Sequence, residues 1–251
     1  MVAAGFAAGS INAAVGSGSL VSFPALLAVG IPPVSATITN SLGLIAGGLT
    51  GSLGYRRELA VLRRWLPAML AGAVLGALLG AWLLLHLPAE TFDAVVPVLV
   101  GLAAVLVAVQ PLLDRALAHR RTDPDAVPHT GRGRLAALAA GSFVTSTYGG
   151  YFAASQGVLL MGVTGLIAPQ PLQRLNALKN ITTMTVNAVA ATAYVVVAPD
   201  LVVWVAAGLL TVGSLAGGWA GATVGRRLPP ALLRAGILVL ACLALAILLS
   251  R

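Results

Sequence analysis

The sequence has few ionisable side chains and a single cysteine, Cys242. Only 9% of its 251 residues are charged, whereas a soluble domain carries about a quarter. One cysteine excludes a disulfide within the chain and any multi-cysteine metal site or thiol relay. The carboxylates all lie at the ends of apolar segments or in predicted loops, so none is placed inside a membrane to relay protons or ligate a metal cation. We therefore expect no metal centre and no cofactor.

Signatures of common enzymes are also missing. The sequence has no GxxxxGK[ST] phosphate loop, no HExxH zinc motif and no Ser/His/Asp nucleophile arrangement. ATP hydrolysis within the chain and an enzymatic activity are therefore not expected. The net charge of +8 could indicate a nucleic-acid partner. However, the arginines lie near the ends of apolar segments, where positive charge fixes orientation in a membrane, so we expect no nucleic-acid partner.

Long apolar runs are what the sequence does contain. Hydrophobic residues make up 59% of the chain, and no charged residue occurs between Met1 and Arg56. Because a helix of about 20 apolar residues spans a bilayer, we predict an all-α polytopic membrane protein of the inner (plasma) membrane, embedded in the lipid bilayer. The apolar segments lie at approximately 3–29, 34–55, 65–86, 92–113, 135–163, 175–198, 201–225 and 231–250.

The apolar segments form a duplicated unit. Residues 32–65 match 171–204 at a constant offset of 139, and residues 76–105 match 217–246 at an offset of 141. A weaker stretch pairs Gly18 with Gly150. Duplication in an apolar chain is typical of transporters whose substrate site lies between the halves. We predict a first transmembrane repeat over 1–113, a cytoplasmic linker over 114–134 and a second transmembrane repeat over 135–251.

The distribution of arginines constrains the topology. Eight simple crossings would put Arg226 and Arg227 outside the cell, against the positive-inside rule. The conflict disappears if the first and fifth segments are re-entrant hairpins, each of two half-helices of about 12 residues. Each repeat then has one hairpin and three transmembrane helices, so the two repeats are inverted, with six full spans and both termini outside. Eight simple transmembrane helices remain the alternative.

The predicted hairpin breaks supply the first candidate binding residues. Non-helical backbone inside a membrane must be buried in protein or line a water-filled cavity. A half-helix that begins at such a break points its N-terminal N–H groups at the midplane of the membrane, where they favour an anion. The same small residues could instead serve close helix packing. The candidate residues near the two breaks are Asn12, Ser17, Gly18, Ser19, Tyr148, Gly149 and Gly150.

A second group of candidates opens the next helix of each repeat. The duplication aligns Asn40 with Lys179 and Ser41 with Asn180, and Asn176 precedes them in the second copy. Polar side chains inside a membrane need partners, and a polar ligand is one such partner. Lys179 would make the site cationic if it faces a cavity; the alternative is a lysine that extends to the cytoplasmic interface.

Glycines recur every four residues in two of the segments, as in Gly72-Gly76-Gly80 and Gly213-Gly217-Gly221-Gly225. Such stripes allow close helix packing. They could lie inside the protein or at the interface of a homodimer.

The chain resembles the sulfite exporter TauE/SafE family. The resemblance is carried by the pattern G-x-x-x-A-x-x-G-x-G-x-L-x-x-x-P-x-L from Gly9 to Leu26, and by G-[IV]-P-P-x-x-A-x-x-T-[NS]-S from Gly30 to Ser41. Tyr55-Arg56-Arg57 closes the following helix, and a degenerate second copy completes the match. The resemblance implies a duplicated membrane permease for sulfite, sulfonates or other small organic or organosulfur anions.

Together these observations predict a secondary transporter of small anions that works by alternating access at a midplane site. The hairpin tips would offer N–H groups, the Asn and Ser side chains would bind substrate oxygens, and Lys179 would supply charge. An anion channel and a non-transporting membrane scaffold are the alternatives.

Overall fold

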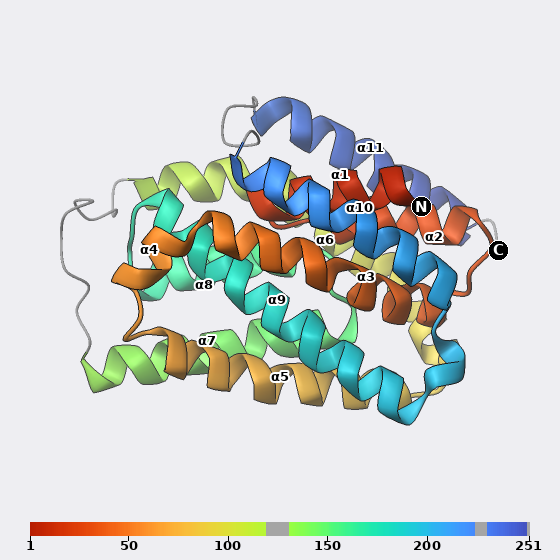
Figure 1. Cartoon of the computed structure of the whole chain (residues 1–251), viewed down its shortest axis with the longest axis horizontal. Coiled ribbons are helices and arrows are strands. Elements are labelled where there is room, and N and C mark those ends of the chain that lie inside the picture. Colours follow the sequence, from red (N-terminus) through yellow and green to blue (C-terminus); the bar gives the residue numbers. More distant parts are fainter. Residues whose placement is uncertain (119–130, 224–229, 250–251) are drawn as a thin grey trace.

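The computed structural model of the chain describes residues 1–118, 131–223 and 230–249, and the regular elements in this part are all helices (Figure 1). The predicted linker residues 119–130, and Arg226 and Arg227, lie outside the described residues. The helices are α1 (Val2–Ala14), α2 (Ser19–Ala28), α3 (Pro33–Gly54), α4 (Arg56–Val61), α5 (Leu66–His86), α6 (Ala89–Ala118), α7 (Arg132–Tyr151), α8 (Gln156–Ile167), α9 (Leu172–Val197), the 3₁₀ turn η1 (Pro199–Leu201), α10 (Trp204–Thr223) and α11 (Pro230–Leu249).

Several helices are suited to a bilayer. Four of those described are long and apolar enough to cross a membrane: Leu66–His86, Glu90–Leu112, Leu172–Val197 and Trp204–Thr223. Their outer faces carry exposed large apolar side chains, such as Leu75, Trp82, Val98 and Val205. Apolar surface on this scale marks a contact with lipid or protein rather than with water. The prediction of an all-α polytopic membrane protein is confirmed at this level.

The first apolar segment is broken where the sequence predicts. Helix α1 ends at Ala14 and α2 begins at Ser19. Between them Gly16 has a φ of +96°, a left-handed conformation that glycine adopts without steric cost. The chain folds back at this point and brings Gly18 against α1. A Cβ atom on Gly18 would lie only 2.1 Å from the carbonyl oxygen of Ala8.

The second break does not lie where the sequence predicts. Tyr148, Gly149 and Gly150 are helical, since α7 continues to Tyr151, and the break falls at 152–155. Consequently α7 has 20 residues rather than about 12, while α8 has 12. The placement at Tyr148–Gly150 is therefore wrong. The turn is made without glycine: Ala153 and Ser155 themselves adopt positive φ values of 64° and 57°.

The described members of the glycine stripes lie inside the protein and join its two halves, whereas Gly225 lies outside the described residues. A Cβ atom on Gly217 in α10 would lie 2.1 Å from the carbonyl oxygen of Phe6 in α1, and one on Gly76 in α5 would lie 2.3 Å from that of Phe143 in α7. Each hairpin is thus packed against a helix from the other half of the chain. Only glycine permits this backbone-to-backbone approach.

The helices run in two opposite directions. Successive glycine contacts pair Gly43 with Leu210 and Gly47 with Ser214, so α3 and α10 are parallel. Gly48 contacts Met184 and Gly51 contacts Asn180, so α3 and α9 are antiparallel. Accordingly, α3 runs toward the end of the molecule that carries α4, whereas α9 starts at that end and runs away from it (Figure 1).

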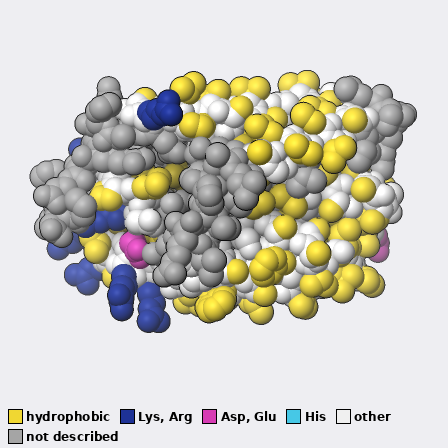
Figure 2. Space-filling view, turned by 90° about the horizontal axis from the view of Figure 1, so that it is seen from above, with side chains coloured by type: hydrophobic (Ala, Val, Ile, Leu, Met, Phe, Trp, Pro, Cys, Tyr) yellow, Lys and Arg dark blue, Asp and Glu magenta, His cyan; other side chains and the backbone are white. Residues whose placement is uncertain are grey.

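Positive charge gathers at one end of the molecule. Figure 2 shows Lys and Arg side chains toward one end and hydrophobic side chains along the flank. Arg56 and Arg57 lie in α4, Arg63 and Arg64 precede α5, and Arg132 begins α7. The N-terminus lies at the opposite end (Figure 1).

Candidate functional site

The two helical hairpins meet at their breaks. A Cβ atom on Gly16, in the first break, would lie 3.0 Å from Cα of Gly157, in the first turn of α8. Phe23 of α2 and Phe152 of the second break form an edge-to-face pair with ring centroids 5.3 Å apart. The first turn of α8 therefore faces the first break. Gly157 is a contact that the sequence did not indicate.

Lys179 lies beside this junction and is completely buried. Its ammonium group donates hydrogen bonds to the backbone carbonyl oxygens of Asn12 at 2.8 Å and Ala13 at 3.1 Å. Asn180 donates a third, from Nδ2 to the Ala13 oxygen at 3.3 Å. Lys179 therefore lies within the body of the folded chain, with its ammonium group on buried backbone carbonyls.

The partners of Lys179 follow from the helix break. The last carbonyls of a helix have no intrahelical donor and carry the negative end of the helix dipole. Helix α1 ends at Ala14, and Asn12 and Ala13 in its last turn are buried. A buried ammonium group stabilises this helix end in two ways. It donates hydrogen bonds to the unpaired carbonyls, and its positive charge opposes the negative end of the helix dipole.

Asn40 holds the other side of the same break. Its Nδ2 donates to Oγ of Ser19 at 3.1 Å, and its Oδ1 accepts a hydrogen bond from Ser22. Asn40 thus fixes the start of α2, as Lys179 fixes the end of α1. Asn40 and Lys179, which the duplication aligns, therefore form hydrogen bonds on the two sides of the first break.

Several buried polar groups near this junction have no hydrogen-bond partner. They include Oγ of Ser17 in the break, and Oδ1 of Asn176 and Oγ1 of Thr182, each three residues from Lys179 on α9. Buried polar atoms in proteins are almost always paired, so these three atoms leave hydrogen-bonding capacity that a ligand could use. Thr182 was not among the sequence candidates, although its place one turn beyond Lys179 could have indicated it.

The remaining sequence candidates have other surroundings. Ser41 donates to the Thr37 carbonyl of its own helix at 3.0 Å. Gly149 faces the side chain of Gln156, and Gly150 packs on the backbone of Ala77. The carbonyl of Gly150 accepts a hydrogen bond from the hydroxyl of Tyr194.

Tyr148 completes the set of candidates near the second break. Its hydroxyl is buried without a partner, and its ring packs against Phe152. Near the second break, the sequence candidates therefore pack against other residues and offer one unpaired hydroxyl, that of Tyr148. The buried ammonium of Lys179 instead contacts the first hairpin.

The part of the chain that the structure describes contains His, Cys, Asp and Glu side chains, which are common metal ligands. No three His, Cys, Asp or Glu side chains there come together in a way that could hold a metal ion. The charged group of the candidate site is the Lys179 ammonium, which is held by two backbone carbonyl oxygens.

Comparison with known proteins agrees with this picture. The family profile "Sulfite exporter TauE/SafE" matches residues 1–248. The "Probable membrane transporter protein ORF9" of Sinorhizobium sp. is 34% identical over 122 residues, which cover 48% of this chain and 46% of the relative. A "Probable membrane transporter protein" of Haemophilus influenzae is 38% identical over 96 residues, or 38% of each chain.

The "Probable membrane transporter protein YfcA" of Escherichia coli K12 is 28% identical over 181 residues, 69% of this chain and 64% of the relative. These matches span less than two thirds of each relative, and no solved structure gives a significant match. The family profile, in contrast, covers almost the whole chain. With its apolar helices and two hairpins, the chain belongs to the sulfite exporter TauE/SafE family of membrane transporters.

Proposed function

We propose that the protein is a secondary transporter of small anions, above all sulfite, sulfonates or related organosulfur and organic anions. The observation that carries this proposal is Lys179, a completely buried ammonium beside two helix breaks. A buried charge inside a membrane protein is costly and typically marks a substrate pathway. The sign of the charge selects an anion.

The groups around Lys179 suit an oxyanion. Ser17 and Thr182 offer unpaired hydroxyls, and Asn176 offers an unpaired side-chain oxygen. Sulfite and sulfonate groups present several oxygens that accept hydrogen bonds together, and a charged partner strengthens each bond. The oxygen of Asn176 would match a protonated oxygen or an amino group of the substrate. The pairing of one cation with several hydroxyls favours a compact anionic group.

Alternating access would follow from two inverted repeats. Helices α3 and α9 are aligned by the duplication and run antiparallel, which supports inversion. The arginine-rich end would face the cytoplasm of a cell whose inner membrane holds the protein, and the N-terminus would lie outside. Each glycine-packed pair, α1 with α10 and α7 with α5, would move as one body around the site.

The contacts of Lys179 suggest how substrate binding and movement are coupled. The ammonium group of Lys179 has three N–H donors, and two of them are used by the carbonyls at the end of α1, which leaves one for a substrate. An anion that bonds several oxygens to Lys179 and draws it away from these carbonyls would leave the end of α1 held by Asn180, while Asn40 still holds the start of α2. Substrate binding would thus loosen the first hairpin on one side of its break. Return of the lysine to Asn12 and Ala13 would close the empty site.

The test is anion uptake into proteoliposomes by wild-type protein and by Lys179→Met, which keeps the length of the side chain without its charge. Loss of a charge-assisted hydrogen bond costs about 1.5–3 kcal/mol, or about 10- to 150-fold in affinity. Sulfite, taurine, sulfoacetate, thiosulfate, sulfate and a carboxylate should be compared. Uptake that saturates and exchanges one substrate for another supports a carrier. Unchanged uptake by the Met variant would remove Lys179 from the site.

A pair of serine variants separates binding from folding. Ser17 has no partner in the structure, so Ser17→Ala should lower anion affinity by about 2- to 10-fold with little change in thermal stability. Ser41 already bonds its own helix, so Ser41→Ala should leave affinity unchanged. Equal effects of the two variants on affinity would argue against a site at the first break.

A further inference from the structure

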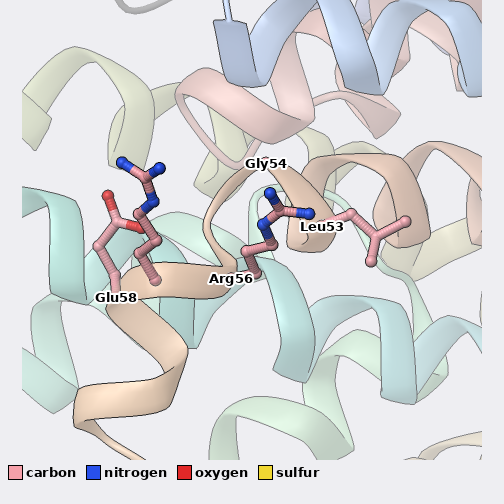
Figure 3. Close-up of a pocket in the computed structure, with 5 residues that line it drawn as sticks. Leu53, Gly54, Arg56 and Glu58 are labelled. Carbon is pink, nitrogen blue, oxygen red and sulfur yellow. The ribbon is translucent and has the colours of Figure 1, made fainter.

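The sequence Tyr55-Arg56-Arg57 follows the end of α3, and the proposed transport site makes no use of its two arginines. A cavity of about 340 Å³ opens at this point, lined by Leu53, Gly54, Arg56, Arg57 and Glu58. Figure 3 shows the Arg56 side chain with Leu53 on one side and Glu58 on the other. The cavity is a second, separate place where the protein presents cationic groups.

Local structure fixes the direction of these arginines. The Tyr55 side chain is buried in a cluster with Ala13, Ala177 and Ala222. With Tyr55 anchored inward, the next residues begin the short helix α4 and expose both guanidinium groups. The arginines are therefore held at the rim of a cavity by a buried aromatic neighbour, rather than being placed at random on the surface.

The cavity lies where the apolar flank meets the charged end. Leu53 is 58% exposed at its edge, and Val61 at the end of α4 is 46% exposed. In a bilayer, a position between exposed apolar side chains and a cluster of arginines is the level of the phospholipid headgroups. A ligand arriving here would have an acyl-chain surface on one side and water on the other.

We propose that this cavity binds the phosphodiester headgroup of an anionic phospholipid. Guanidinium groups match phosphate oxygens in planar, bidentate geometry. The two arginines and one glutamate that line the cavity sum to a formal charge of +1. That charge complements the single negative charge of a phosphodiester better than the higher charge of free phosphate. The Glu58 carboxylate can accept a hydrogen bond from the hydroxyls of a glycerol headgroup.

The chain provides a matched control for this proposal. Arg63 and Arg64 form a second pair of adjacent, exposed arginines between α4 and α5, at the same charged end but outside the cavity. The variants Arg56→Gln/Arg57→Gln and Arg63→Gln/Arg64→Gln remove the same charge from different places, and both are compared with the wild type. Lipid retention in native mass spectrometry after exchange into phosphatidylglycerol-containing micelles gives the readout.

We expect the wild type and the Arg63/Arg64 variant to retain phosphatidylglycerol, and the Arg56/Arg57 variant to retain at least 5-fold less. Phosphatidylethanolamine should be retained less than phosphatidylglycerol, and inorganic phosphate should not raise the unfolding temperature. Equal losses in both double variants would mean general surface attraction and overturn the proposal, as would stabilisation by phosphate alone. Should the Gln variant fail to fold, Arg56→Lys/Arg57→Lys keeps the charge, loses the fork geometry and should still weaken retention.

Discussion

The ammonium nitrogen of Lys179 in α9 lies 2.8 Å from the backbone carbonyl oxygen of Asn12 in α1, a contact between residues 167 positions apart. It places the one buried lysine of the described chain at the negative end of a helix that stops inside the protein. Two helices from different repeats are therefore joined by a charge rather than by apolar packing alone. Under the proposed function, this is the contact for which a bound anion would compete.

If release of the first hairpin is required for transport, a cross-link that prevents it should stop transport. A Cβ atom on Gly51 in α3 would lie 3.3 Å from Cβ of Ala13 at the end of α1, close to the separation of about 3.5–4.5 Å found in disulfides. Ala13→Cys/Gly51→Cys, combined with Cys242→Ala to remove the native thiol, should form this bond on oxidation. We expect uptake to fall to background when oxidised and to recover on reduction.

The reduced double variant and the two single variants are the controls for that experiment, because they carry the same substitutions without the bond. Quantitative cross-linking is measured on the same sample by thiol titration. A fully cross-linked protein that transports at the rate of its reduced form would show that the end of α1 does not need to move away from α3.

Two glycines of the same helix should respond in opposite ways to alanine. On Gly217 a Cβ atom would lie 2.1 Å from the Phe6 carbonyl oxygen, whereas Gly208 has nothing within 4 Å. Gly217→Ala must push α10 away from α1, which we expect to lower stability by about 1–3 kcal/mol. Gly208→Ala should be neutral or stabilise by up to about 1 kcal/mol, because alanine favours a helix. Unfolding midpoints in detergent give both values; a similar response at both sites would contradict the packing of α10 on α1.

The two breaks predict a second contrast. Ala153 has a φ of 64°, which costs an L-residue about 1–2 kcal/mol that glycine does not incur. Ala153→Gly should therefore stabilise the protein by up to about 1 kcal/mol. The reverse change in the first break, Gly16→Ala, meets both a φ of +96° and Cδ of Lys179 at 2.7 Å from the new Cβ, and should destabilise. Thermal unfolding of the two variants measures these shifts, and a destabilising Ala153→Gly would be inconsistent with the left-handed turn.

These backbone values explain which parts of the fold sequence reasoning can reach. The first break is visible in the sequence because glycine supplies its left-handed residue at Gly16. The second is hidden, since Ala153 and Ser155 adopt the same conformation under tertiary constraint. The sequence analysis placed the second break at the nearby Gly149 and Gly150. In the structure these glycines allow close packing on Gln156 and Ala77. Composition alone does not distinguish a turn glycine from a packing glycine.

The candidate site was predictable to a similar extent. Charge counting and the duplication single out Lys179 and Asn40 from the sequence, and burial of the lysine agrees with that prediction. The partner of Lys179 is the Asn12 carbonyl, and that of Asn40 is the Ser19 hydroxyl. Neither pair follows from spacing in the sequence, because each depends on which hairpin the helix packs against. The contact of Gly16 with Gly157 likewise depends on how the two hairpins pack. Such long-range contacts arise from tertiary structure and leave no local pattern.

A pair of tyrosines near the second break should separate a structural hydroxyl from a functional one. The Tyr194 hydroxyl donates to the carbonyl of Gly150, so Tyr194→Phe leaves that buried acceptor unpaired. We expect it to lose about 1–3 kcal/mol of stability while the remaining folded protein keeps its anion affinity.

The Tyr148 hydroxyl has no partner, so Tyr148→Phe should keep or slightly raise stability. If substrate reaches the second break, the same change should lower anion affinity by about 2- to 10-fold. Thermal unfolding and equilibrium anion binding on both variants give a two-by-two comparison. An unchanged affinity for Tyr148→Phe would confine the binding site to the first break, with Lys179 and Ser17.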